Sequence, residues 1–347
     1  MKIAQIAPLA ESVPPRLYGG TERVVSYLTE ELVRLGHDVT LFASGDSQTS
    51  ARLVACAPRA LRLDPNVKDP LPHHLLMIER VRSRAHEFDV LHFHMEHVHL
   101  PLFRPLARKC VTTMHGRLDL PDLPALYREF DDMPLVSISN AQRRALPHAN
   151  WVATVYHGLP EPVCPYNPAP RGGYLAFIGR VSPEKGIERA IEIAKRAQMR
   201  LRIAAKVDRA EEEYWRARVA PLLSHPLIEF LGEVGEADKP AFLGNATALL
   251  FPIDWPEPFG LAMVEAMSCG TPVIAWPHGS VPEVVEHGVT GLVVDSIEAA
   301  VAAVGEARRL DRGELRRRFD ERFSAARMAH DYLAVYRNLR TLKKEPA

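Results

Sequence analysis

Two kinds of segment alternate along nearly the whole chain, and this alternation constrains the fold more than any other feature. Short apolar runs rich in Val, Ile and Leu are followed by longer segments whose apolar residues recur every three or four positions. The short runs predict buried strands, and the longer segments predict amphipathic helices. Because strands that alternate with helices form parallel sheets covered by helices, the sequence predicts an α/β fold.

The alternation runs through both halves of the chain. We expect strands at residues 2–7, 39–42, 90–93, 111–115, 135–139 and 152–156, and again at 174–178, 202–205, 228–231, 248–251, 272–275 and 292–294. The first helix is the best marked, because it opens at Thr21 after two glycines and stops at Gly36. Further helices are expected at 187–197 and 261–269.

A proline-dense stretch separates the two halves. Five of the twelve residues from 159 to 170 are prolines, which can continue neither a helix nor a central strand. We therefore expect a linker at 161–172 between two Rossmann-like domains at 1–160 and 173–325. A C-terminal helix at 326–347 is expected to pack back on the N-terminal domain.

The composition narrows the class of protein. At 347 residues the chain is long enough for two domains, and its 43 Lys and Arg balance its 43 Asp and Glu, so we expect no nucleic-acid partner. Its four cysteines form no C-x-x-C pair, which favours buried thiols in a reducing compartment over a zinc ribbon or a disulfide framework. No signal peptide or run of about 18 apolar residues is evident, so we expect a cytoplasmic protein.

Two loops that follow predicted strands carry residues suited to bind an anion. Gly19 and Gly20 let backbone N–H groups approach an anion at a helix N-terminus, or they simply mark the helix start. Arg180 ends a strand and Lys185 precedes the next helix, so they either reach one diphosphate together or are two separate surface cations. The loop at Gly19 and Gly20 is not a G-x-G-x-x-G or P-loop, so a dinucleotide cofactor is poorly supported.

The run from Trp255 to Gly270 holds two glutamates in different settings. Flanking prolines keep Glu257 in a loop before a helix. Glu265 lies within that helix, which is apolar on nearly every side and is therefore expected to be buried. A buried carboxylate needs partners, so Glu265 is either a salt-bridged core residue or an acceptor of hydrogen bonds from ligand hydroxyls.

Histidines mark the ends of two strands in the first half. His115 follows one strand, while His92 and His94 share one face of another. A metal site is one reading of the pair, but the spacing fixes no third ligand, and strand-end histidines can equally serve as structural or hydrogen-bonding residues. We therefore expect no metal. The Arg-rich tail after Ala299 is either a solvated face or a surface that meets a membrane.

Together these motifs resemble one family. The run from Glu257 to Glu265 looks like the E-x7-E signature of retaining glycosyltransferases of family four, which have the GT-B fold. Matching stretches are Tyr-Gly-Gly at 18–20, Gly-His-Asp-Val at 36–39, Gly-Arg-Val-Ser-Pro-Glu-Lys-Gly at 179–186, Pro-Glu-Val-Val at 282–285 and Gly-x-x-Gly at 288–291. The resemblance spans nearly the whole chain and implies two Rossmann-like domains whose parallel sheets face each other across a cleft.

The resemblance also implies roles. Arg180 and Lys185 would hold the donor diphosphate, and Glu265 would hold the ribose. The donor sugar would be bound by Glu257 and by the backbone at Phe259, Gly260 and Leu261. From the N-terminal domain, which is the acceptor side, Gly19 and Gly20 would touch the phosphates, and His115 would contact the transferred sugar. His115 and Glu257 are thus the implied catalytic residues.

The chain departs from the family at three places. His157-Gly158 stands where Asn-Gly is usual, and His278-Gly279-Ser280 stands where Gly-Gly is common. Ala205-Lys206-Val207 replaces the family's glycine after the second strand of the C-terminal domain. Contacts at these places are therefore less closely defined by the resemblance.

The motifs also suggest a mechanism and a donor. No Asp-x-Asp occurs, so we expect protein cations and helix N-termini, rather than a metal or a cofactor, to stabilise the leaving diphosphate. The resemblance implies front-face substitution with retention. The short length and the Tyr-Gly-Gly-Thr-Glu-Arg opening are similar to UDP-glucose-dependent members, including tetrahydrobiopterin glucosyltransferases, which places UDP-glucose first and GDP-mannose second. The acceptor would be a small molecule, a glycan or a lipid-linked hydroxyl compound.

Other functions compete with this one. A GT-B-fold sugar-nucleotide epimerase or phosphorylase needs a similar cleft, but the E-x7-E run weighs against it. A non-catalytic sugar-nucleotide binder or hinged receptor would be expected to be secreted, and a nicotinamide dehydrogenase would show the glycine fingerprint.

Overall fold

The structure, a computed structural model, describes residues 1–16 and 18–341. The chain folds into two compact units. Unit 1 comprises Met1–Gly158 together with the C-terminal segment that begins at Ala325, and unit 2 comprises Leu159–Ser324. The proline-rich stretch at 161–172 thus counts with unit 2. Of the C-terminal helix expected at 326–347, residues 342–347 lie outside the described part.

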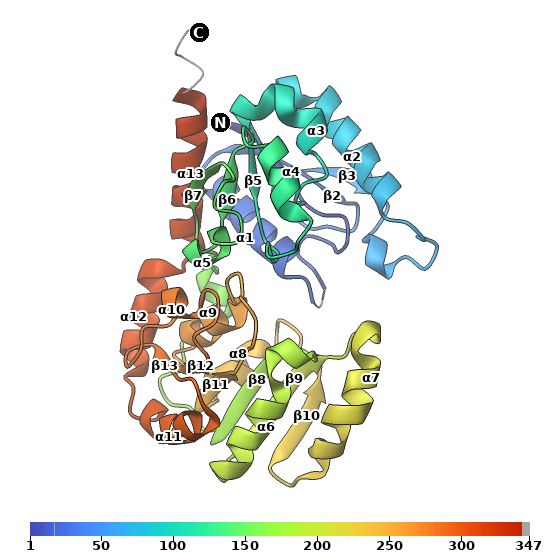
Figure 1. The fold of residues 1–347 in the computed structure, drawn as a ribbon. Coiled ribbons are helices and arrows are strands. Elements are labelled where there is room, and N and C mark those ends of the chain that lie inside the picture. Colours follow the sequence, from blue (N-terminus) through green and yellow to red (C-terminus); the bar gives the residue numbers. More distant parts are fainter. Residues whose placement is uncertain (17, 342–347) are drawn as a thin grey trace. The chain divides into compact units, whose positions relative to one another are not determined.

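Unit 1 contains a parallel sheet flanked by helices (Figure 1). Its strands in the described residues are β1 (Lys2–Ile6), β2 (Asp38–Ser44), β3 (Arg52–Ala57), β4 (Val90–Phe93), β5 (Cys110–Thr113), β6 (Leu135–Ser137) and β7 (Trp151–Thr154), in the order β3-β2-β1-β4-β5-β6-β7. Its helices are α1 (Gly20–Arg34), α2 (Leu71–Ser83), α3 (Leu100–Phe103), α4 (Leu123–Glu129), α5 (Asn140–Arg143) and α13 (Ala325–Thr341). The strand order reverses between β1 and β4.

Unit 2 repeats this plan. Its described strands are β8 (Tyr174–Arg180), β9 (Arg200–Lys206), β10 (Ile228–Gly232), β11 (Ala248–Phe251), β12 (Val273–Ala275) and β13 (Gly291–Val293), all parallel, in the order β10-β9-β8-β11-β12-β13. Its helices are α6 (Ile187–Arg196), α7 (Glu212–Tyr214), α8 (Lys239–Gly244), α9 (Leu261–Ser268), α10 (Val281–Val284), α11 (Ile297–Ala307) and α12 (Arg312–Arg322). Here the order reverses between β8 and β11.

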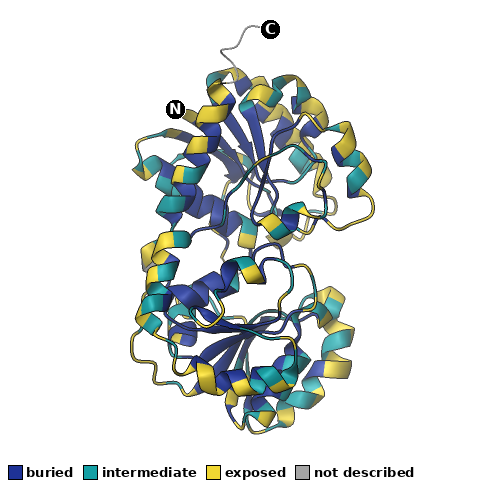
Figure 2. Ribbon diagram, turned by 60° about the vertical axis from the view of Figure 1, so that its left-hand side comes forward, coloured by how far each residue is buried: buried dark blue, intermediate teal, exposed yellow. Residues whose placement is uncertain are grey.

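The predicted α/β class is confirmed, and each predicted strand is present to within a few residues. The sequence analysis missed β3, which pairs with β2 at the edge of the sheet and is only partly buried. Residues 53–57, Leu-Val-Ala-Cys-Ala, form a continuous apolar run, so the sequence did contain a signal for this strand and the prediction overlooked it. The buried strands of both sheets are enclosed by helices with exposed outer faces (Figure 2).

The arginines of the C-terminal part are largely used inside unit 2. Arg312 donates hydrogen bonds to several backbone carbonyls, including that of Gly244 at 2.8 Å. Arg318 and Arg322 form ion pairs with Glu286. A membrane-surface role for this region stays a prediction. Within the described residues, no helix is both long and apolar enough to cross a membrane.

A glycine docks the loop after β8 on the loop after β11. Gly186 has a φ of 72°, and a Cβ there would lie 2.1 Å from the carbonyl oxygen of Pro252. The neighbouring backbone adds a hydrogen bond from the Asp254 N–H to the Glu184 carbonyl at 2.8 Å. Only glycine combines this left-handed backbone with so close an approach.

We therefore expect Gly186→Ala to lower the free energy of unfolding of unit 2 by about 2–4 kcal/mol, which adds the cost of a left-handed alanine to that of displacing a carbonyl. Gly232→Ala is the matched control, because Gly232 has a φ of 73° and no atom within 4 Å of its Cβ position. In Gly232→Ala, the free energy of unfolding should fall by only about 1–2 kcal/mol. Urea denaturation followed by tryptophan fluorescence measures both, and equal losses would contradict the docking role.

Candidate functional site

In open parallel sheets, ligands bind beyond the carboxyl ends of the strands, where the strand order reverses. The predicted site residues fall in these places. In unit 2, Arg180 is the last residue of β8, and the loops after β8 and β11 hold Lys185 and Glu257. In unit 1, the strands β1, β4 and β5 lead into the other candidate loops.

Two cations lie at the end of β8 and on the loop that follows it. Arg180 is one-third exposed, and its guanidinium forms two long ion pairs with described residues, 3.7 Å to Glu184 and 4.0 Å to Asp208. Lys185 is more enclosed, with Nζ 2.6 Å from Glu257 and 4.5 Å from the centre of the Trp255 ring. Arg180 is therefore loosely held, whereas Lys185 is fixed by a carboxylate and an aromatic face.

The loop after β11 presents Glu257 from a rigid backbone. Ser280 N–H donates to the Glu257 carbonyl at 2.9 Å, and a Cβ on Gly279 would lie 2.3 Å from Glu257 N and O. The Glu257 side chain is only 10% exposed. Gly279, which the sequence analysis noted only as a departure from the family, is thus the residue that allows this close packing.

The other glutamate lies deeper in unit 2. Glu265, on α9, pairs with Lys239 at the start of α8, and Nζ and Oε1 are 2.7 Å apart. The two side chains are 5% and 12% exposed. The salt bridge foreseen as one reading of Glu265 is present, and its ribose role stays a prediction.

The first turn of α9 follows the predicted sugar-binding backbone. Gly260 has a φ of 81° and precedes Leu261, the first residue of the helix. Phe259 is buried, and its carbonyl accepts a hydrogen bond from the Ser280 hydroxyl at 2.8 Å. The protein's own groups therefore hold this turn in place.

In unit 1, Gly19 and Gly20 open α1 as expected. A Cβ on Gly19 would lie 2.7 Å from Cβ of Pro15, so the loop packs closely before the helix. Glu22 is buried in the first turn, and burial raises the pKa of its carboxyl. The buried carboxyl of Glu22 thus already lies at the N-terminus of α1.

His115 belongs to a cluster of imidazoles. Its Nε2 lies 2.9 Å from Nδ1 of His94, and its ring stacks on His157 with centroids 5.2 Å apart. Burial lowers the pKa of His115 to about 3 and that of His94 well below its usual range. These rings are therefore neutral at physiological pH. His157 had been noted only as a departure from the family.

The two strand histidines are engaged with protein groups. His92 contacts the Tyr336 hydroxyl and Thr113 Oγ1, each at 2.7 Å, and His94 contacts Gln5 Oε1 at 2.7 Å. Among residues 1–16 and 18–341, no group of three or more His, Cys, Asp or Glu side chains is placed to hold a metal ion.

A carboxylate beside His115 went unnoticed in the sequence. Glu96 follows β4 with a φ of 58°, an uncommon backbone conformation for a residue other than glycine. Its Oε1 accepts a hydrogen bond from the Gly116 N–H at 3.1 Å. Burial outweighs the backbone hydrogen bonds and raises the pKa of Glu96 to about 6. The positive φ and this contact are properties that no sequence pattern predicted.

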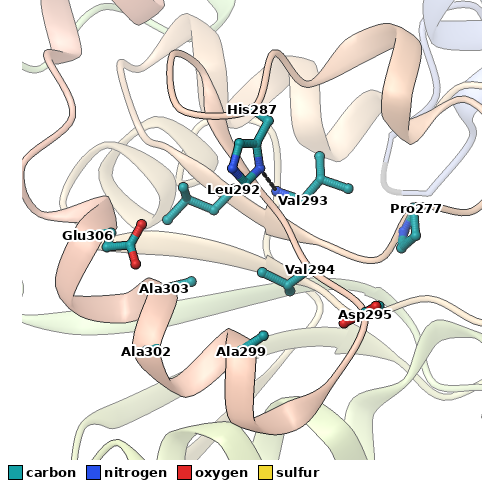
Figure 3. A pocket seen from close by; sticks show the side chains of 10 residues that line it. All are labelled: Pro277, His287, Leu292, Val293, Val294, Asp295, Ala299, Ala302, Ala303 and Glu306. Atoms are coloured by element: carbon teal, nitrogen blue, oxygen red, sulfur yellow. Dashed lines mark hydrogen bonds between the residues drawn. The ribbon is translucent and has the colours of Figure 1, made fainter.

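Unit 2 also contains a separate pocket of about 490 Å³ (Figure 3). It is lined mainly by β13 and α11, with His287, Asp295 and Glu306 as its titratable groups. His287 Nδ1 accepts a hydrogen bond from the Val293 N–H at 3.1 Å. None of the predicted site residues lines this pocket.

Comparison with known proteins identifies the family. The model described as Glycosyltransferase Family 4 matches residues 18–166, and that described as Glycosyl transferases group 1 matches residues 166–324. The chain is a family 4 glycosyltransferase with the GT-B fold. The sequence motifs had indicated the same family.

Relatives of this glycosyltransferase include several sugar-transferring enzymes. It is 27% identical to the phosphatidyl-myo-inositol mannosyltransferase of Mycobacterium leprae, over 96% of this chain and 94% of the relative. Among solved structures, sucrose-phosphate synthase from Thermosynechococcus elongatus gives a TM-score of 0.79 at 19% identity, covering 99% and 100% of the two chains. An Anabaena protein, HepE, solved with UDP and glucose gives 0.76 at 18% identity, covering 97% and 100%.

Glu96 gives the glycosyltransferase a pH-dependent stability. Folding raises the pKa of the Glu96 carboxyl from near 4.5 to about 6. The protonated carboxyl therefore contributes fully to the free energy of unfolding below pH 4.5, and this contribution is lost as the pH rises through 6. The stability of the wild type relative to Glu96→Gln should fall by about 1–2 kcal/mol across that window. Urea denaturation of both proteins from pH 4 to 8 measures this, and a constant difference would contradict the raised pKa.

Proposed function

We propose that the protein is a retaining hexosyltransferase that moves a sugar from a nucleotide-sugar to an acceptor hydroxyl without a catalytic metal. UDP-glucose is the first candidate donor and GDP-mannose the second. The acceptor is a small molecule, a glycan or a lipid-linked compound. The observation that carries this proposal is the grouping of Arg180, at the end of β8, with Lys185 and Glu257, on the loops after β8 and β11. The strand order of unit 2 reverses between these two strands, at its switch point.

The cations suit a leaving diphosphate. A nucleotide-sugar releases negative charge on its diphosphate in the transition state, and fixed protein cations stabilise that charge as it develops. Arg180, with its long ion-pair distances, is free to turn toward an anion. Lys185 would share its ammonium between the diphosphate and Glu257, so donor binding would reorganise this ion pair.

Named relatives support both donors. The Anabaena structures contain UDP, glucose or UDP-glucose, which supports UDP-glucose. Two relatives that match over most of this chain are phosphatidyl-myo-inositol mannosyltransferases, which supports a mannose-bearing donor. Retention is supported by the E-x7-E run from Glu257 to Glu265, and metal independence by the absence of Asp-x-Asp.

The direct test is slow transfer of the donor sugar to water. We expect release of free sugar from UDP-glucose or GDP-mannose, first as the α-anomer that the donor carries, and unchanged in excess EDTA. Arg180→Ala should weaken nucleotide binding by roughly 1.5–3 kcal/mol, the strength of a charge-assisted hydrogen bond, and should remain folded. Anomer-resolved NMR and calorimetry measure these effects. Release of β-sugar would contradict retention, and loss of activity in EDTA with rescue by Mg²⁺ would contradict metal independence.

Glu257 and Glu265 form a matched pair for a second test, because each contacts one lysine. Glu257 Oε2 lies 2.6 Å from Lys185 Nζ, and Glu265 Oε1 lies 2.7 Å from Lys239 Nζ. Glu257→Gln should keep most affinity for free UDP but lose turnover, since its hydrogen bonds to the sugar strengthen in the transition state. Glu265→Gln should weaken UDP and UDP-glucose alike. Calorimetry with both ligands decides: normal UDP binding by Glu265→Gln together with lost UDP binding by Glu257→Gln would reverse the two roles.

A further inference from the structure

Lys185 has a second partner besides Glu257, namely the indole ring of Trp255. Its Nζ lies 4.5 Å from the centre of that ring and 2.6 Å from Glu257 Oε2. The ring of Phe251 is a more distant neighbour, with its centre 5.9 Å from Nζ. An ammonium within about 6 Å of an aromatic ring is attracted by the negative face of that ring. Trp255 and Glu257 therefore both attract the same ammonium.

One tight turn in unit 2 presents the ring and the carboxylate together. The Glu257 N–H donates to the Trp255 carbonyl at 2.8 Å, so the two residues are held close in the loop after β11. Lys185 comes from the loop after β8, and its side chain is 15% exposed. Because little water reaches the ammonium, its attraction to both partners is weakly screened.

The indole contacts Lys185 with the face of its ring and not with its N–H. Nε1 of Trp255 is buried and donates a hydrogen bond to no described group. A buried N–H without a partner lowers stability, so hydrogen bonding does not explain a tryptophan at this position. What the side chain offers the loop is its electron-rich face, which among the aromatic residues is strongest in tryptophan.

The ring and the carboxylate hold the ammonium in different ways. Glu257 neutralises the charge of Lys185 and so competes with any anionic ligand. The ring of Trp255 has no net charge, so it attracts the ammonium and leaves its charge available. An ammonium has three N–H donors, and Glu257 accepts from one of them. When an anion draws Lys185 away from Glu257, the ring is thus a partner that does not compete.

We propose that Trp255 is a positioning residue, which holds the Lys185 ammonium in place for the donor diphosphate while the ion pair with Glu257 loosens. The diphosphate rests on the proposed function, whereas the contact between ring and ammonium does not. Without the ring, the flexible Lys185 side chain would have to be ordered when the ligand binds. Ordering one such side chain weakens binding by about two- to tenfold.

The first experiment measures the contact in the full-length protein without any ligand. Trp255→Leu, Lys185→Met and the double variant form a double-mutant cycle, read by urea denaturation with circular dichroism. We expect the two losses of stability not to add. The coupling should change the unfolding equilibrium constant by about two- to thirtyfold, the range for a cation on an aromatic face. Additive losses would show that the ring does not hold the ammonium and would overturn the proposal.

The second experiment measures nucleotide binding by calorimetry, with UDP and with GDP. Trp255→Leu should raise the Kd by about two- to tenfold. Trp255→Phe keeps an aromatic face and should stay within about twofold of the wild type. Trp215→Leu is the matched control, because Trp215 is also a half-buried tryptophan of unit 2 but packs on Phe230, with ring centroids 4.6 Å apart. Its Kd should equal that of the wild type.

Lys185→Met separates positioning from a direct contact between the ring and the nucleotide. In that background, Trp255→Leu should change the Kd no further, because the ring has no ammonium left to hold. An effect of Trp255→Leu that persists there at full size, or an unchanged Kd in Trp255→Leu while Lys185→Met binds weakly, would overturn the positioning role alone. Normal nucleotide binding by Lys185→Met would instead contradict the diphosphate site of the proposed function, and the positioning role with it.

Discussion

The ion pair between Lys185 and Glu257 organises the loops after β8 and β11 in unit 2. It joins the loop after β8 to the loop after β11, and little water screens it because the two side chains are only 15% and 10% exposed. Gly186 packs on the Pro252 carbonyl, which joins the same two loops. Arg189, on α6, contacts Asp254 at 2.6 Å and holds the loop after β11 from the helix. The position of each charged group near the switch point therefore depends on this docking.

The two units use one topology for different chemistry. In unit 2, the strand ends at the switch point carry cations in contact with carboxylates, which suits an anionic ligand. In unit 1, the same region carries imidazoles whose pKa values burial holds far below neutrality. Its strand ends therefore offer neutral hydrogen-bonding groups, which suit hydroxyls better than phosphates.

The sequence analysis was most successful where the chemistry is local. Arg180 could be placed at a strand end, and Lys185 and Glu257 on loops, because strand patterns and prolines mark these positions directly. No local pattern marks Lys239 as the partner of Glu265, or Tyr336 as a partner of His92. Glu96 also escaped notice, because neither its positive φ nor its contact with the Gly116 N–H follows from its neighbours in the sequence.

By itself, the sequence determined the α/β class, the family motifs and the loops on which the chemistry lies, because apolar periodicity and turn residues act over a few neighbouring positions. Only the tertiary structure decided which side chains meet. Tyr336 lies 331 residues from Gln5 and 244 from His92, yet contacts both, because the chain returns to unit 1 and packs α13 beside the sheet. Strand order and helix packing determine such partners. They bring distant segments into contact, and no local sequence pattern identifies the residues that meet.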